Sequence, residues 1–153
     1  MNEVEVIEFE EKYAKDFADL NYEWIEKFFE IEDIDRKYLE NPKEMIVDKG
    51  GAILLARYNN RIVGTVSLLD LGNGVFELAK MSVHPDLRGK KIGHLIMDAC
   101  IEKARVLGAN QILILSSRKL KNALHLYEKY GFKDVGNEDD DYHRCDIRMT
   151  LDL

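Results

Sequence analysis

Hydrophobic residues follow two different spacings along the chain, and the spacings divide it into strands and helices. Alternating or continuous apolar segments predict strands, and apolar residues at every third or fourth position predict helices. Strand patterns cover residues 4–9, 52–58, 61–69, 75–83, 112–115, 132–135 and 144–151. Helical patterns cover residues 13–31, 35–39, 91–107 and 120–130. The sequence therefore predicts a mixed α/β structure.

Turn residues indicate how the strands are joined. Asn59-Asn60 separates two strand patterns, and asparagine tolerates the positive φ of a two-residue hairpin. Gly72-Asn73-Gly74 predicts a second hairpin turn, and Pro42 a break after the short helix. The fully apolar segment 112–115 is typical of a central strand covered on both faces. We expect antiparallel hairpins first, then a strand-helix-strand-helix segment.

Composition narrows the class of protein. We expect the 153 residues, 46% of them hydrophobic, to form one domain spanning 1–153. A formal charge of -7 argues against nucleic-acid binding, and no apolar run reaches the roughly 20 residues of a membrane span. The acidic N-terminus lacks a signal-peptide pattern. Cys100 and Cys145 form no CxxC motif and are expected to be buried filler, so a reduced cytoplasmic setting fits best.

A basic turn stands out on this acidic chain. Pro85 ends a strand pattern, and a helical pattern starts a few residues later. Between them lie Arg88, Gly89, Lys90 and Lys91. Free backbone N–H groups and the helix dipole favour an anion at a helix start, so the turn predicts a phosphate ligand. The alternative is an ordinary strand-helix turn with solvated basic residues.

Two segments resemble the GNAT N-acetyltransferase superfamily. Residues 76–93 are similar to its acetyl-CoA motif, a strand followed by Arg/Gln-x-x-Gly-x-Gly/Ala, and residues 123–132 match A-x-x-L-Y-x-x-x-G-F. The resemblance implies a mixed, mostly antiparallel central sheet of about six to seven strands flanked by about four helices. Lys91 stands where the motif usually has its first glycine, and could still donate its N–H if its φ is negative. Leu120 stands where many members have asparagine.

The resemblance also implies how acetyl-CoA would bind. The CoA diphosphate would lie on backbone N–H groups from Arg88 through His94. The pantetheine arm would pair with the motif strand, which must separate from its neighbour after Gln111. A backbone N–H near Met81 or Val83 would receive the thioester carbonyl. The cofactor-binding residues implied in this way are Met81, Ser82, Val83, Arg88, Gly89, Lys90, Lys91, Ile92, Gly93 and His94.

Acetylation of an amine requires two proton transfers. A primary amine of pKa near 10 costs about 4 kcal/mol to deprotonate at pH 7. Glu77, a charge within an otherwise apolar part of its strand, is the candidate base; the alternative is an edge carboxylate that faces solvent or pairs with a lysine such as Lys80. Tyr127 matches the family tyrosine that donates a proton to the leaving thiolate, and a core tyrosine is the alternative reading.

The acceptor is less well defined by the sequence. The first helix usually covers the acceptor site, which draws attention to Asn21, Tyr22, Glu23 and Trp24, with packing the simpler role for Trp24. The acidic run Glu138 to Asp141 could attract a cationic acceptor, or could be a solvated hairpin tip. The histidines have no metal-binding spacing, so no metal is expected.

We therefore expect an acetyl-CoA-dependent N-acetyltransferase. It would transfer acetyl to a primary amine of a small molecule or protein by direct attack in a ternary complex. The alternative is a non-catalytic acyl-CoA sensor of the same fold, which the presence of both Glu77 and Tyr127 disfavours. Expected partners are acetyl-CoA and an amine, with neither nucleic acid nor membrane. A homodimer could form if the last strand is an exposed edge.

Overall fold

A computed structural model describes residues 3–87, 91–136 and 145–153 of the chain. Within these ranges, seven strands form one open sheet, as the resemblance implied. The strands are β1 (Glu5–Glu8), β2 (Ala52–Tyr58), β3 (Arg61–Asp70), β4 (Val75–Val83), β5 (Gln111–Ser116), β6 (Lys133–Asp134) and β7 (Ile147–Asp152). Their order across the sheet is β1-β2-β3-β4-β5-β7-β6.

Four α-helices accompany the sheet in the described part of the chain. They are α1 (Ala14–Phe28), α2 (Asp33–Glu40), α3 (Ile92–Val106) and α4 (Lys121–Lys129). Short 3-10 turns occupy Glu11–Tyr13 and Pro85–Leu87. The sequence did not predict the π-helical turn Lys43–Val47, which begins directly after Pro42. Proline ends α2 as expected, and its fixed φ also suits the start of this next turn.

The strands pair antiparallel, except where β4 and β5 run parallel. The β2–β3 hairpin turns at Asn59 and Asn60, whose φ values of 51° and 61° confirm the predicted tight turn. The expectation that the last strand is an edge was wrong. β7 lies between β5 and the two-residue β6, which pairs Lys133 with Thr150 and Asp134 with Met149.

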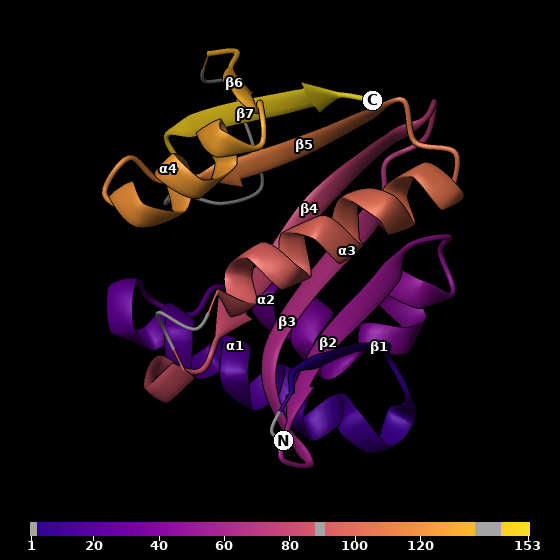
Figure 1. Cartoon of the computed structure of the whole chain (residues 1–153), viewed down its shortest axis with the longest axis vertical. Coiled ribbons are helices and arrows are strands. Elements are labelled where there is room, and N and C mark those ends of the chain that lie inside the picture. Colours follow the sequence, from indigo (N-terminus) through magenta and orange to yellow (C-terminus); the bar gives the residue numbers. More distant parts are fainter. Residues whose placement is uncertain (1–2, 88–90, 137–144) are drawn as a thin grey trace.

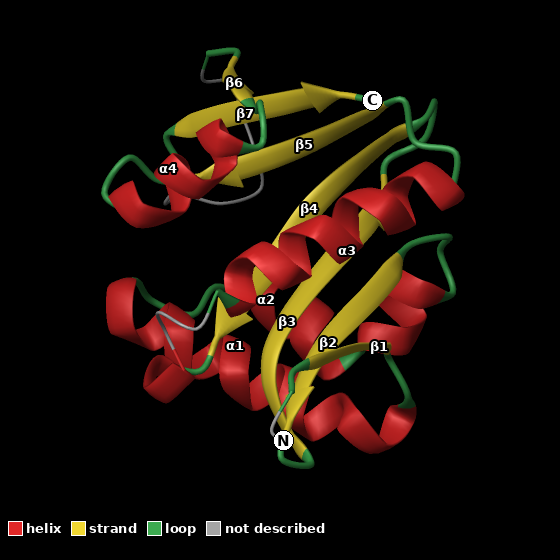
Figure 2. Cartoon of the chain, in the orientation of Figure 1, coloured by secondary structure: helices red, strands yellow, loops and turns green. Residues whose placement is uncertain are grey.

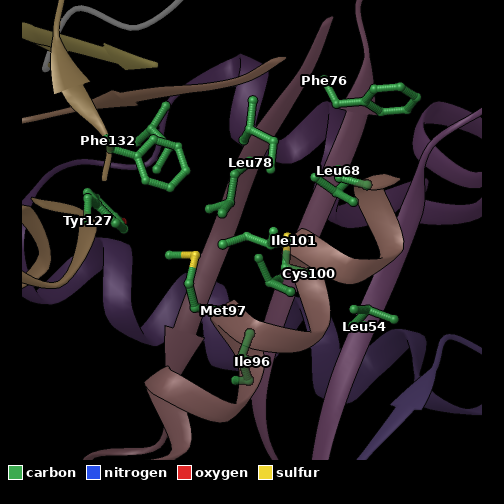
Figure 3. Close-up of a cluster of buried hydrophobic side chains, with 14 of the residues drawn as sticks. Leu54, Leu68, Phe76, Leu78, Ile96, Met97, Cys100, Ile101, Tyr127 and Phe132 are labelled. Atoms are coloured by element: carbon green, nitrogen blue, oxygen red, sulfur yellow. The ribbon is translucent and has the colours of Figure 1, made fainter. Parts of the chain in front are cut away.

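Two apolar cores cover the two faces of the sheet. In Figures 1 and 2, α3 and α4 lie on the near side, while α1 and α2 lie behind β2 and β3. The near core joins residues of α3 and α4 to alternate strand residues such as Leu54, Leu68 and Leu78 (Figure 3). The far core joins α1 and α2 to the intervening residues, such as Ile53, Leu55 and Leu69. The period-two pattern of the strands therefore determines which side chains face which helices.

Candidate active site

The sheet opens between β4 and β5. The two strands pair only from Val75–Gln111 to Leu78–Ile114, and beyond these residues they diverge as a V (Figure 1). The separation therefore begins three residues later than the position after Gln111 expected from the sequence. The second half of β4 is left with one free edge in this gap.

A β-bulge lies at the same level of β4. Thr65 pairs with Ser82 and Ser67 pairs with Ala79, so Lys80 and Met81 together oppose Val66. Lys80 has a left-handed backbone with φ of 53°. The Thr65 hydroxyl donates to the Lys80 carbonyl at 2.8 Å, and the Asn21 amide donates to that hydroxyl at 3.1 Å. A bulge re-aims the backbone of its strand, and here buried side chains brace it.

A cavity of about 610 Å³ passes through this gap. This volume is in the range of pockets that bind small molecules and cofactors. One wall comes from β4, a second from the start of α3, a third from the segment between β5 and α4, and the last from α1. The opening therefore connects the α3–α4 face of the sheet with the α1–α2 face.

The described cofactor-binding candidates all line this cavity. They are Met81, Ser82, Val83, Lys91, Ile92, Gly93 and His94. Arg88, Gly89 and Lys90 lie outside the described residues. The acidic run Glu138 to Asp141 also lies outside them.

Lys91 has the backbone conformation that favours glycine. Its φ of 60° and ψ of 24° are left-handed, so the condition of a negative φ, under which its N–H could still donate, is not met. Such a conformation costs a residue with a Cβ roughly 1–2 kcal/mol. Lys91 precedes the first residue of α3 and makes no side-chain cap there.

The two candidate catalytic residues line the same cavity from different faces of the sheet. Glu77 is half-buried on β4, and alternation places it opposite Phe76 and Leu78, which belong to the α3–α4 core. Tyr127 belongs to that core and packs on Phe132, with ring centroids 6.1 Å apart (Figure 3). Burial raises the pKa of Tyr127 to about 12. Tyr127 is therefore a core tyrosine that also lines the cavity, and its role as a proton donor stays a prediction.

The α1 residues selected from the sequence separate into two groups. Asn21 and Trp24 line the cavity. The Tyr22 hydroxyl donates to Glu40 at 3.2 Å, and Glu23 borders a separate hollow of about 80 Å³. Trp24 also packs on the core of that face, so its expected packing role and a place in the cavity wall coexist.

A buried ion pair in the cavity wall was missed from the sequence. Lys80 Nζ lies 2.8 Å from Asp35 Oδ1, and their side chains are 5% and 0% exposed. Asp35 Oδ2 also accepts the backbone N–H of Glu32 at 2.8 Å, which caps α2. The partners are 45 positions apart, so no local pattern joins them; the single sequence signal is a lysine within a largely apolar strand.

The sequence also missed residues after β5 and at the end of α1. Phe28, Phe29, Lys119 and Cys145 line the cavity. Cys145 is half-buried, which differs from the expected core filler, whereas Cys100 is fully buried and burial raises its pKa to about 12.

Comparison with known proteins agrees with this geometry. The family model described as "Acetyltransferase (GNAT) domain" matches residues 16–153. The chain belongs to the GNAT acetyltransferase family. An uncharacterized N-acetyltransferase of Schizosaccharomyces pombe is 28% identical over 77% of the chain and 75% of its own length. Another from Escherichia coli is 28% identical over 68% of the chain and 65% of its own length.

Solved structures share the GNAT fold over almost the whole chain. A GNAT acetyltransferase of Staphylococcus aureus has a TM-score of 0.91 at 23% identity and covers 99% of both chains. A putative acetyltransferase of Salmonella typhimurium, solved with its cofactor acetyl-CoA, has a TM-score of 0.78 at 17% identity, covering 98% of this chain and 94% of its own. No helix in the described part of this GNAT chain is long and apolar enough to cross a membrane.

Proposed function

We propose that the protein transfers an acetyl group from acetyl-CoA to a primary amine of a small molecule or protein. The amine attacks the thioester directly in a ternary complex. The observation that supports this most strongly is the cavity through the β4–β5 gap. It is lined by seven of the implied CoA-binding residues and by both candidate catalytic side chains.

The CoA would enter from the α3–α4 face. Its diphosphate would meet the backbone N–H groups at the start of α3, and its pantetheine arm would run along the free edge of β4. The solved relative with acetyl-CoA supports the choice of cofactor. The bulge at Lys80 and Met81 turns the β4 backbone in this region, and a backbone N–H near Met81 or Val83 would stabilise the thioester oxygen as negative charge develops.

Glu77 is proposed as the base that accepts the proton of the acceptor ammonium. It faces the α1–α2 side of the sheet, the side opposite to the α3–α4 face from which the CoA would enter. An amine entering from that side would therefore meet the carboxylate before it reaches the thioester. Deprotonation at pH 7 accounts for about 4 kcal/mol of the barrier, and the carboxylate supplies a positioned acceptor for that proton.

Tyr127 is proposed as a hydrogen-bond donor to the leaving sulfur. A phenol with a pKa of about 12 stays protonated throughout the working range of the enzyme. A thiol has a pKa of about 8.5, so complete proton transfer from this phenol to the thiolate is uphill by roughly 3.5 pKa units. The physical role that fits is a hydrogen bond that strengthens as the C–S bond breaks, with the thiolate released to solvent.

The first experiment separates catalysis from cofactor binding. Acetyl-CoA binding is measured by thermal stabilisation, and free thiol release is followed over a pooled panel of amines. Amine-dependent thiol release is expected. Stabilisation by acetyl-CoA without release from any amine, free or on a protein, would contradict the transferase proposal and favour the sensor. No stabilisation would contradict acetyl-CoA as the cofactor.

A further inference from the structure

The α1 side of the cavity is aromatic. Trp24, Phe28 and Phe29 line it, with ring centroids 5.4 Å (Trp24–Phe28), 6.1 Å (Trp24–Phe29) and 6.5 Å (Phe28–Phe29) apart. None of these residues is fully buried, and all three contribute to the cavity lining. This aromatic wall, defined as these three residues, suits a planar apolar group, because offset and edge contacts between rings are favourable.

Lys119 adds a positive charge beside the aromatic wall. Its Nζ donates to the carbonyl oxygen of Phe28 at 2.6 Å and lies 4.1 Å from the centroid of the Phe29 ring. Both partners are electrically neutral. The ion pairs formed among residues 3–87, 91–136 and 145–153 do not include Lys119.

The two lysines on this side of the cavity therefore differ in charge balance. Lys80 is paired with the buried carboxylate of Asp35, whereas Lys119 takes part in none of the ion pairs among the described residues. A ligand carboxylate next to Lys119 would gain a charge-assisted hydrogen bond without losing an existing ion pair. A ligand cation at the same place would meet like charge.

The geometry points to an aromatic α-amino acid as the acceptor, which rests on the transferase function proposed above. Its ring would lie on the aromatic wall and its carboxylate on Lys119, leaving the α-amine directed at the thioester. The acceptor ammonium gives up one proton to the base; the amine formed makes the N–C bond to the thioester carbonyl carbon and loses its second proton to solvent. The C–S bond breaks, and its electron pair leaves with the CoA thiolate.

Matched acceptors test this assignment. L-Phenylalanine, its amide and 2-phenylethylamine share the ring and a primary amine, and only the first carries a carboxylate. With the wild-type protein, kcat/KM is expected to be about tenfold higher for L-phenylalanine than for either analogue. Lys119→Met keeps an unbranched side chain as far as Cε and removes the charged Nζ, so this preference should disappear through loss of L-phenylalanine turnover alone.

Lys27→Met is the matched control. Lys27 also lies over a phenylalanine, with Nζ 5.5 Å from the Phe28 centroid, but it borders the separate small hollow instead of the cavity. The control should keep the wild-type preference. Equal loss of all three acceptors in Lys119→Met, or a wild-type preference for 2-phenylethylamine or for a polyamine such as spermidine, would overturn the assignment.

The outcomes also separate this inference from the proposed function. Thiol release with other amines but none with L-phenylalanine would reject the amino-acid acceptor and leave the transferase intact. If no amine gives thiol release, binding of N-acetyl-L-phenylalanine by thermal shift decides the subsite. Stabilisation that is lost in Lys119→Met would support the carboxylate site, and its absence in wild type would reject it. Acetylation of Lys119 itself, read by mass spectrometry, would also reject it.

Discussion

The turns of the hairpins and the wall of the cavity both use left-handed backbone, but with different residues. Besides glycines, five described residues have positive φ, and three of them are asparagines at the β2–β3 and β3–β4 turns. The other two are Lys80 and Lys91, and both line the cavity. Asparagine tolerates this conformation at low cost, whereas lysine does not.

In the hairpin turns the residue type suits the left-handed backbone, whereas in the cavity wall Lys80 and Lys91 adopt it at a cost in conformational energy. Strained backbone persists only where its surroundings determine it strongly. Lys80 meets this condition through its ion pair with Asp35 and through the Thr65 hydroxyl on its carbonyl. Lys91 has no corresponding side-chain cap at the start of α3. The two strained lysines should therefore respond differently to substitution.

The largest effect is expected at the ion pair that holds Lys80. Asp35→Asn keeps an oxygen that can cap α2 but removes the charge 2.8 Å from Lys80 Nζ. Removing one partner of a buried pair costs about 3 kcal/mol or more, because the other charge stays desolvated. The free energy of unfolding in urea should fall by this amount.

A double-mutant cycle supplies the control. In the Lys80→Met background, Asp35→Asn should cost much less, because no ammonium is left beside it. Equal costs in both backgrounds would show that the ion pair does not hold the bulge. The cycle would then remove the distinction between Lys80 and Lys91.

The next largest effects are expected from removing the hydroxyl of Tyr127, in α4, or of Tyr130, the C-cap of this helix. Tyr127→Phe should lower kcat about 100-fold, because the phenol hydrogen bond to the leaving sulfur is lost, with little change in acetyl-CoA binding. Tyr130→Phe is the matched change outside the cavity. The single proton of the Tyr130 hydroxyl is shared between Asp98 Oδ1 at 2.6 Å and the His94 carbonyl at 3.1 Å, so loss of the hydroxyl should lower stability by about 1–3 kcal/mol.

The comparison requires that Tyr127→Phe changes mainly turnover and that Tyr130→Phe changes mainly stability. Steady-state kinetics and urea unfolding are measured on both variants. Unchanged turnover in Tyr127→Phe would remove this residue from the mechanism and leave it a core tyrosine. A 100-fold loss of turnover in Tyr130→Phe at unchanged stability would contradict the choice of Tyr127 as the hydrogen-bond donor to the leaving sulfur.

The sequence predicted most of the architecture because that information is local. Alternation identified the strands, and Asn59-Asn60 identified the hairpin. The near-complete apolar run of β5 indicated its central place between β4 and β7. The edge position was wrong for β7, because the pattern at 132–135 predicted the strand that becomes β6 but not that this strand pairs on the outer side of β7.

The site was predictable only in part. The family motifs indicated the residues of β4 and α3 that line the cavity, together with Tyr127. The bulge at Lys80, the Asp35–Lys80 pair and the position of Lys119 against Phe28 depend on contacts between distant segments. A bulge adds one residue to a strand without changing its composition, so apolar alternation alone does not reveal it.

Alanine substitutions of the glycines at the two ends of α3 should change stability in opposite directions, and by less than the substitutions above. A Cβ on Gly93 would lie 3.6 Å from Leu126, which is ordinary contact, so Gly93→Ala should stabilise the helix by up to about 1 kcal/mol. Because Gly93 lines the cavity, the added methyl should weaken acetyl-CoA binding severalfold. Gly108→Ala should instead destabilise by about 1 kcal/mol, since Gly108 has φ of 86°, and should leave binding unchanged.

Calorimetric titration with acetyl-CoA and urea unfolding measure both quantities. If Gly93→Ala is more stable and binds acetyl-CoA as tightly as wild type, the glycine is not reserved for the ligand.

The smallest effect tests the second strained lysine. Lys91→Gly removes the strain of a left-handed conformation, which costs roughly 1–2 kcal/mol. Glycine, however, loses more backbone entropy on folding than other residues, which opposes this gain by about 0.5–1 kcal/mol. A net gain of roughly 0.5–1 kcal/mol in unfolding free energy is therefore expected. Asn60→Gly, at φ of 61°, should gain nothing, because asparagine already tolerates the turn. Equal gains at both positions in urea unfolding would mean that lysine in the cavity wall is no more strained than asparagine in the hairpin.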